Sequence, residues 1–296
     1  MIVTRTKGLL AAAGALGLSL LLSASAHAFT FTQSSGFVDG TETHTSGPAG
    51  SGIRFFGPST VTTDGSTTVP TGLSAYSVIA WGNGLGAGVD ANLANAPSFT
   101  AIPGGGPNAG RSGLMLLDHS GTINPGDTVV LAEVFHRNQP ITDPTLRHVD
   151  IFSILSIFDG ATQLLADSNN VPIDFHETPN AAPCNPATQI SATACDDYFT
   201  FPLGPFASLN FSDGEHDYTL SFELQCLSSD TGLARCEIPN PDDPTGGRII
   251  TAESRINHLA ILMTLTQNTV EVPAPPALLL LGLGLVGVAA AARRRG

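Results

Sequence analysis

The chain has 296 residues, and its 25 acidic residues outnumber its 12 lysines and arginines to give a formal net charge of −13. An acidic surface repels nucleic acid and anionic membrane surfaces, so no nucleic acid is expected as a partner. The length allows one large β domain or two small ones. The acids would attract divalent cations or basic partners, although solubility alone explains such a surface.

The first 28 residues have the pattern of a secretory signal peptide. A basic start is followed by an apolar run over residues 8–22 and by the small-x-small site Ala26-His27-Ala28, which signal peptidase would cleave. Phe29 is the predicted first mature residue. The exported part, residues 29–272, holds seven arginines, no lysine and 25 acids, so its formal charge is 7 − 25 = −18.

Residues 29–267 are predicted to form an all-β ectodomain, an antiparallel sandwich of jelly-roll-like type. Runs of β-branched and aromatic residues alternate with glycine, proline and asparagine turns, and helix signals are scarce. Residues 149–158 are apolar on both faces, which is typical of a central strand. Residues 218–224 alternate apolar and polar side chains, which indicates a half-buried strand. Further strands are predicted at residues 76–81, 114–117, 128–135, 198–201 and 259–266.

Two loops are predicted between these strands. The glycine-rich connection from Gly82 to Gly113 is long enough to be functional or mobile. Residues 242–247, Asp-Asp-Pro-Thr-Gly-Gly, form the second loop.

The four cysteines are predicted to form disulfides, because an even number in an exported chain favours disulfides over a metal site. They are Cys184, Cys195, Cys226 and Cys236. Three pairings are open. Local pairing of the first two and of the last two would close two short loops, and each closure would stabilise the fold by about 3 kcal/mol.

The last residues of the chain predict where in the cell the protein is located. A proline-rich linker, residues 268–276, precedes the apolar segment 277–292 and the basic tail 293–296, which contains Arg293, Arg294 and Arg295. As a transmembrane helix the apolar segment would be about 24 Å long, slightly short of a bilayer core of about 30 Å. Basic residues beside a span stay cytoplasmic, so the ectodomain would lie outside the inner membrane.

The tail resembles the PEP-CTERM sorting signal of Gram-negative bacteria, in which a membrane-embedded cysteine protease, the exosortase, recognises Pro-Glu-Pro. Here the motif reads Val272-Pro273-Ala274-Pro275, with alanine in place of glutamate. The resemblance implies an inner-membrane intermediate, followed by the periplasm, the outer surface or the extracellular matrix. It also implies an exosortase-like protease, the membrane and exopolysaccharide as partners. A plain C-terminal anchor is the alternative.

A second resemblance covers most of the ectodomain. The motifs occur in the order Ile79-Ala80-Trp81-Gly82, Arg111-Ser112-Gly113-Leu114, Phe135-His136-Arg137-Asn138, Asp213-Gly214 and Cys226. This order is similar to the THxN family of PEP-CTERM proteins, although Phe135 replaces the threonine of its Thr-His-x-Asn motif. The resemblance implies a fold and an exported location, but it implies no catalysed reaction.

His136 and Asn138 are the first candidate site residues. Histidine can bind a metal or move a proton near neutral pH, and asparagine can bond the hydroxyls of a ligand. The structural alternative is that both side chains bond backbone groups and fix a corner. Trp81 is interpreted as a core residue rather than a sugar-stacking platform.

Asp213, Glu215 and Asp217 form a candidate calcium site, because they alternate as the first ligands of a calcium loop do. Tyr218 and Leu224 occupy positions at which an EF-hand needs glycine and glutamate, so that template fails. The alternative is a hairpin turn at Asp213-Gly214.

No catalytic signature is present: the sequence has no G-x-S-x-G, H-E-x-x-H or P-loop motif, and no catalytic residue is assigned. The neighbouring pairs Asp118-His119 and His176-Glu177 point to opposite faces of a strand, so adjacency does not make them dyads. The expected function is that of an exported envelope or matrix protein with a structural or binding role. It needs no cofactor apart from the candidate calcium. The alternative is a secreted hydrolase of polysaccharides or esters, with residues 82–113 as a lid.

Overall fold

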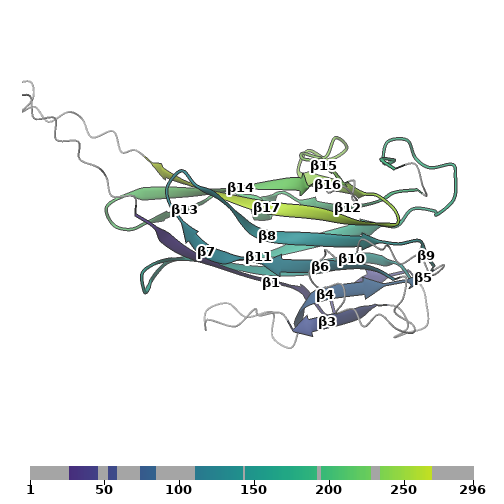
Figure 1. Cartoon of the computed structure of the whole chain (residues 1–296), viewed down its shortest axis with the longest axis horizontal. Helices are drawn as coiled ribbons and strands as arrows, with labels where there is room; N and C mark the ends of the chain where they lie inside the picture. The colour runs from purple at the N-terminus through teal and green to yellow at the C-terminus, as the bar shows by residue number, and fades with distance from the viewer. Residues whose placement is uncertain are drawn as a thin grey trace, which may run out of the picture.

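The protein is all-β in the computed structural model, which describes residues 27–45, 53–58, 74–84, 111–142, 144–191, 195–227 and 234–268. Figure 1 shows long strands running side by side in a sheet that curls into a half-barrel. Within the described ranges the only helical element is the short 3-10 turn η3 (Gly204–Phe206). The all-β prediction is confirmed.

The strands belong to one continuous antiparallel sheet and one small two-stranded sheet. In the main sheet the order is β13-β14-β17-β8-β6-β4-β1-β10-β11-β12-β16-β15, with β2, β3 and β7 paired to β10, β4 and β1; β5 pairs with β9 in the small sheet. The strand bounds are β1 (Phe29–Val38), β2 (Thr43–His44), β3 (Arg54–Pro58), β4 (Ala75–Trp81), β5 (Asn83–Gly84), β6 (Ser112–Asp118), β7 (Ser120–Ile123), β8 (Thr128–Asn138), β9 (Ile141–Thr142), β10 (Leu146–Asp159), β11 (Thr162–His176), β12 (Asp197–Pro202), β13 (Leu209–Ser212), β14 (Asp217–Leu227), β15 (Ala234–Glu237), β16 (Gly246–Thr251) and β17 (Arg255–Asn268).

The interior lies between the two halves of the curled sheet. Its larger cluster joins side chains of β11, β12 and β16 to side chains of β6, β8 and β17, with Trp81 and Phe175 among them. The second cluster lies toward the other end and is built around Phe29, Tyr218 and Leu265. The expected sandwich is therefore a single sheet whose two facing halves remain hydrogen-bonded through β1, β4 and β10.

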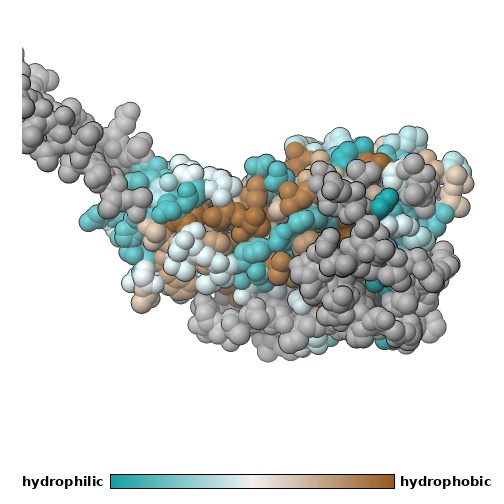
Figure 2. All heavy atoms as spheres, in the orientation of Figure 1, coloured by the Kyte–Doolittle hydropathy of each residue, from teal (hydrophilic) through white to brown (hydrophobic). Residues whose placement is uncertain are grey.

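Hydrophobic side chains also reach the surface. Figure 2 shows a band of them along the face on which β8, β14 and β17 lie in Figure 1. Two small cavities of about 70 and 60 Å³ lie along the inner side of these strands, with Phe206 and Ile261 in the walls of both. Val130 on β8 is 37% exposed.

All seven predicted strands are present, and β10 is buried on both faces as expected. The predicted loop at residues 242–247 is shorter than expected, because β16 already begins at Gly246. A Cβ atom at Gly247 would lie 2.5 Å from Cζ of Phe201, so the missing side chain at Gly247 lets β16 pass beneath that ring. Most of the glycine-rich connection from 82 to 113 lies outside the described residues.

The disulfides are the local pairs. Cys184 is bonded to Cys195 and Cys226 to Cys236, with Cα–Cα distances of 5.1 and 5.7 Å. The first closes the loop between β11 and β12, and the second joins β14 to β15. Two disulfides are typical of a protein that folds in an oxidising compartment.

Candidate functional site

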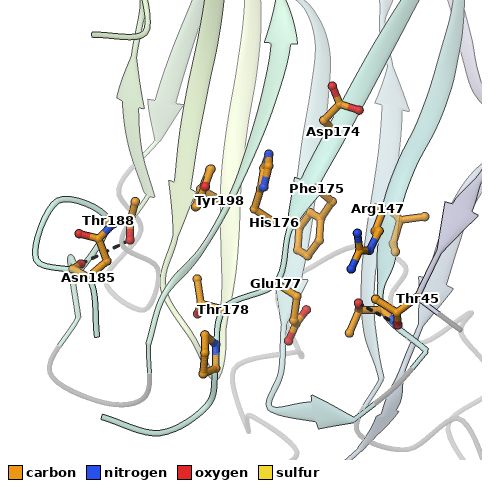
Figure 3. A pocket seen from close by; sticks show the side chains of 13 residues that line it. Thr45, Arg147, Asp174, Phe175, His176, Glu177, Thr178, Asn185, Thr188 and Tyr198 are labelled. Atoms are coloured by element: carbon orange, nitrogen blue, oxygen red, sulfur yellow. Dashed lines mark hydrogen bonds between the residues drawn. The ribbon is translucent and has the colours of Figure 1, made fainter. Parts of the chain in front are cut away.

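An open groove of about 740 Å³ runs over the outer face of β10, β11 and β12. The loop after β11, which carries Asn185 and Thr188, forms one wall, and Thr45, which follows β2, lies at the opposite wall (Figure 3). Most of the lining side chains carry hydroxyl, amide or charged groups. They include Thr45, Arg147, Asp174, His176, Asn185, Thr188 and Tyr198.

The aromatic part of the groove is a stacked pair. The rings of His176 and Tyr198 have centroids 4.5 Å apart and an interplanar angle of 11°, because the two residues are paired across β11 and β12. The Arg248 guanidinium lies 5.9 Å from the Tyr198 ring centroid. Glu237 and Asp242 form ion pairs with Arg248 and thereby fix it. The groove therefore has a rigid aromatic floor with charged groups beside it.

A cluster of buried carboxyl groups lies on the inner side of the same strands. Glu177, Asp197 and Glu253 stand at the ends of β11, β12 and β16, and the last two are fully buried. Each occupies an inward position of its strand, because side chains alternate between the faces. The inward series are Ile173-Phe175-Glu177, Asp197-Phe199-Phe201 and Ile249-Thr251-Glu253.

Burial and mutual repulsion raise the pKa of all three carboxyls. The pKa of Glu177 rises to about 10 through burial and then through the charges of Asp197 and Glu253. The pKa of Glu253 rises to about 9 through burial and then through Asp197 and Asp196. For Asp197 burial raises the pKa to about 7, although the Thr178 N–H and hydroxyl bond its Oδ1 at 2.7 and 3.1 Å and work in the opposite direction.

Several polar atoms in this cluster lack a hydrogen-bond partner. They are both carboxyl oxygens of Glu177 and of Glu253, Oδ2 of Asp197, Oδ1 of Asn138 and Nε1 of Trp81. The Trp81 indole N–H lies close enough to Glu177 to lower its pKa, and the Asn138 amide does the same to Asp197 and Glu253. Neither N–H completes a hydrogen bond to a carboxyl group. Buried polar atoms without partners are rare and costly, so this cluster calls for an explanation.

The residues of the THxN-like motif border the carboxyl cluster. His136 is buried between aromatic rings, with centroids 5.8 Å from Trp81 and 5.2 Å from Phe175. Its Nδ1 lies 2.9 Å from Thr251 Oγ1, and Asn138 Nδ2 donates to the Thr251 carbonyl at 3.1 Å. Both side chains therefore tie β8 to β16, although only Asn138 bonds a backbone group. Trp81 is fully buried, as expected of a core residue.

The candidate calcium loop is a hairpin turn between β13 and β14. Asp213 Oδ1 accepts hydrogen bonds from the N–H groups of Glu215 and His216 at 2.8 and 2.7 Å, and Oδ2 accepts the Tyr218 hydroxyl at 2.9 Å. Despite partial burial, these bonds lower the pKa of Asp213 to about 2. Glu215 and Asp217 point to solvent. The Asp213 oxygens are therefore already used by the turn.

A third polar cluster lies on the outer surface. Glu133 on β8 contacts His119 Nε2 at 2.8 Å and His258 Nε2 at 2.6 Å. Asp118, the sequence neighbour of His119, instead bonds Ser35 across the sheet. His176 and Glu177 also separate, one into the groove and one into the interior. Neither adjacent acid–histidine pair forms a dyad, as the strand alternation predicts.

Some predicted features cannot be placed. The sorting motif Val272-Pro273-Ala274-Pro275 and Arg293, Arg294 and Arg295 lie outside the described residues. Over the described ranges no helix is long and apolar enough to cross a membrane. In those ranges, too, no group of three histidine, cysteine or acidic side chains is placed to hold a metal ion.

No known family model matches the chain, and no curated protein sequence matches it.

The sequence interpretation missed Glu177, Asp197 and Glu253. A signal was present, because each acid keeps the two-residue period of buried aromatic or aliphatic positions. A carboxylate in phase with Phe199 and Phe201 is expected to point inward. That the three strand ends meet is decided by the sheet order alone.

Proposed function

We propose that the protein is an exported binding protein of the bacterial cell envelope and that its groove takes a glycan. The secretory pattern of residues 1–28, the PEP-CTERM-like tail and the two disulfides support export. On this proposal an exosortase-like protease processes the tail, residues 277–292 form a transmembrane helix, and the curled sheet is a variant of the jelly-roll-like THxN ectodomain.

The groove carries the proposal for the ligand. A stacked aromatic pair supplies an apolar surface that suits the C–H face of a sugar ring. Hydroxyl and amide groups around it, such as those of Thr188 and Asn185, suit the sugar hydroxyls. The groove is open to solvent rather than enclosed, so a chain of sugars is a better fit than a small enclosed molecule.

Binding tests this proposal directly. The chain is purified in mild detergent with its disulfides intact and titrated with soluble exopolysaccharide fractions in a calorimeter. Tyr198→Ala should weaken binding at least about tenfold, because it removes the aromatic floor. Tyr76→Ala removes the same side chain from β4, outside the groove, and should leave binding unchanged. Equal affinity of wild type and Tyr198→Ala would refute the groove as the site.

A second candidate function, glycoside or ester hydrolysis, is favoured by one observation. Glu177 borders the groove, and its carboxyl group lies beside that of Asp197, which raises its pKa. A protonated acid beside an ionised one is the arrangement that hydrolases of glycosides use. However, both Glu177 oxygens are buried. Release of reducing ends by wild type, lost in Glu177→Gln and kept in Glu133→Gln, would establish hydrolysis.

The proposed processing and cellular location have a separate test. Mass spectrometry of the chain isolated from cells gives the mature C-terminus. Cleavage near Pro273 supports sorting by an exosortase-like protease, whereas an intact C-terminus at Gly296 supports the plain anchor.

A further inference from the structure

Among the described residues, the charged groups that act on Glu177 and Glu253 in the buried carboxyl cluster are other acids. The charged groups that act on Glu253 are Asp197 and Asp196, and both are negative. Those that act on Glu177 are Asp197 and Glu253. His136, the nearest histidine on the inner face, has its pKa lowered to about 3 by burial and is neutral. The exported part contains no lysine at all.

The unpartnered atoms of this cluster are mostly acceptors. Glu177 and Glu253 contribute two oxygens each, and Asp197 and Asn138 one each, so six oxygen atoms have no hydrogen-bond partner among the described residues. Asn138 is fully buried, and its amide lies against both Asp197 and Glu253. A hard divalent cation binds oxygen ligands of this kind, and on binding it replaces the protons that Glu177 and Glu253 carry in its absence.

We propose that Glu177, Asp197, Glu253 and Asn138 form a binding site for a divalent cation of the calcium class. Six oxygens match the lower end of the six to eight that Ca²⁺ takes, and the absence of thiolate from the set disfavours zinc. Glu177 and Thr178 also line the groove, so a rotation of the Glu177 side chain would connect the cluster to solvent. The site is distinct from the turn at Asp213.

The oxygens of Glu177, Asp197, Glu253 and Asn138 are not arranged around a single point, and this lowers the affinity that we expect for the ion. The Glu177 and Glu253 side chains have to rotate toward the ion, and that rearrangement costs binding free energy. We therefore expect a dissociation constant in the range of about 0.1–1 mM, the range of extracellular calcium modules. A bound ion would fix the ends of β11, β12 and β16 against one another and so stiffen the groove floor.

The sole tryptophan gives a direct readout, because Trp81 lies beside Glu177. Tb³⁺, which binds in place of Ca²⁺, luminesces when a nearby tryptophan transfers energy to it. Excitation at the red edge of tryptophan absorption should give Tb³⁺ emission that added Ca²⁺ displaces. An ion held at the Asp213 turn would be sensitised by Tyr218 and would not respond to this excitation.

The experiment uses the full chain in detergent, stripped with a chelator. Ca²⁺ at about 10 mM should raise the melting temperature of wild type by roughly 3–10 °C. Glu253→Gln should abolish the shift and the Trp81-sensitised emission, and Glu133→Gln, which removes an acid from the surface histidine cluster, should keep both. If Glu253→Gln fails to fold, Asp197→Asn and equilibrium dialysis of wild type with Ca²⁺ alone take its place.

Three outcomes would overturn the proposal. The first is a melting curve and emission spectrum of wild type that do not respond to Ca²⁺. The second is an effect of Ca²⁺ that survives in Glu253→Gln, and the third is one that is lost in Glu133→Gln. Glycan titrations in chelator keep the two proposals apart, because a glycan that binds without Ca²⁺ supports the groove whether or not the ion site exists.

Discussion

His136 Nδ1 lies 2.9 Å from Thr251 Oγ1, and the Thr251 hydroxyl in turn donates to the Asp197 carbonyl oxygen at 3.2 Å. Because the single hydroxyl proton goes to Asp197, the proton between His136 and Thr251 belongs to Nδ1. The ring is neutral, so Nε2 keeps a bare lone pair inside the protein. This chain of bonds holds β8, β16 and β12 together beneath the carboxyl cluster.

Replacing His136 with alanine should destabilise the fold. The change leaves a cavity beside Trp81 and removes the partner of the Thr251 hydroxyl, so we expect the free energy of unfolding to fall by about 2–4 kcal/mol. Urea denaturation followed by circular dichroism measures it. His176→Ala, in the open groove, is the matched control and should cost less than about 0.5 kcal/mol. Equal stability of His136→Ala and wild type would contradict the structural role.

Stability should fall as pH rises when chelator keeps divalent ions away. Glu177, Glu253 and Asp197 have pKa values raised above those of the unfolded chain, which are about 4, so the native state binds more protons. Their stabilising protonation is complete below pH of about 4, and it is lost as pH rises from there through the folded-state pKa values of about 7, 9 and 10.

Urea midpoints at pH of about 5, 7 and 9 test this sign. Repulsion couples the three groups, so the decline should be spread over the range rather than stepwise. Asp197→Asn removes one charge and should flatten the decline. A free energy of unfolding that increases from pH 5 to pH 9 would contradict the arrangement of the cluster.

The Asp213 turn should show the opposite pH dependence. Its lowered pKa means that the ionised form stabilises the native hairpin above the unfolded pKa of about 4, and that this stabilisation is lost as pH falls toward about 2. Asp213→Ala should cost about 1 kcal/mol near neutral pH, because two backbone N–H groups and the Tyr218 hydroxyl lose their acceptor. Thermal melts compare it with Glu215→Ala, which should melt as wild type does.

Removing either disulfide should cost about 3 kcal/mol, since each closes a loop of similar length, with sequence separations of 11 and 10. The double variants are Cys184→Ser with Cys195→Ser, and Cys226→Ser with Cys236→Ser. Urea denaturation gives the loss for each. Peptide mapping without reductant checks the pairing, and a peptide joining Cys195 to Cys226 would contradict it.

The strongest periodic strands were predictable, but the longest strand was not. β11 carries the polar run Asp167-Ser168-Asn169-Asn170 and then Pro172, which read as a turn by composition. In the folded chain β11 pairs with β10 over most of its length and with β12 only at residues 174–176. Polar residues and a proline are tolerated in this part of β11 because β12 does not pair with it, which leaves one edge of the strand without hydrogen bonds to β12.

The sequence by itself determined the all-β class, the seven predicted strands and the separation of His176 from Glu177. These follow from the two-residue period of a strand, which is a local property. Only the tertiary structure decided that Glu177, Asp197 and Glu253 meet, that Asp213 serves a turn, and which cysteines pair. The carboxyl cluster depends on strand order and on the curl of the sheet, which bring Asp197 and Glu253 together across more than fifty positions. The turn and the disulfide pairs are local contacts that the composition left open.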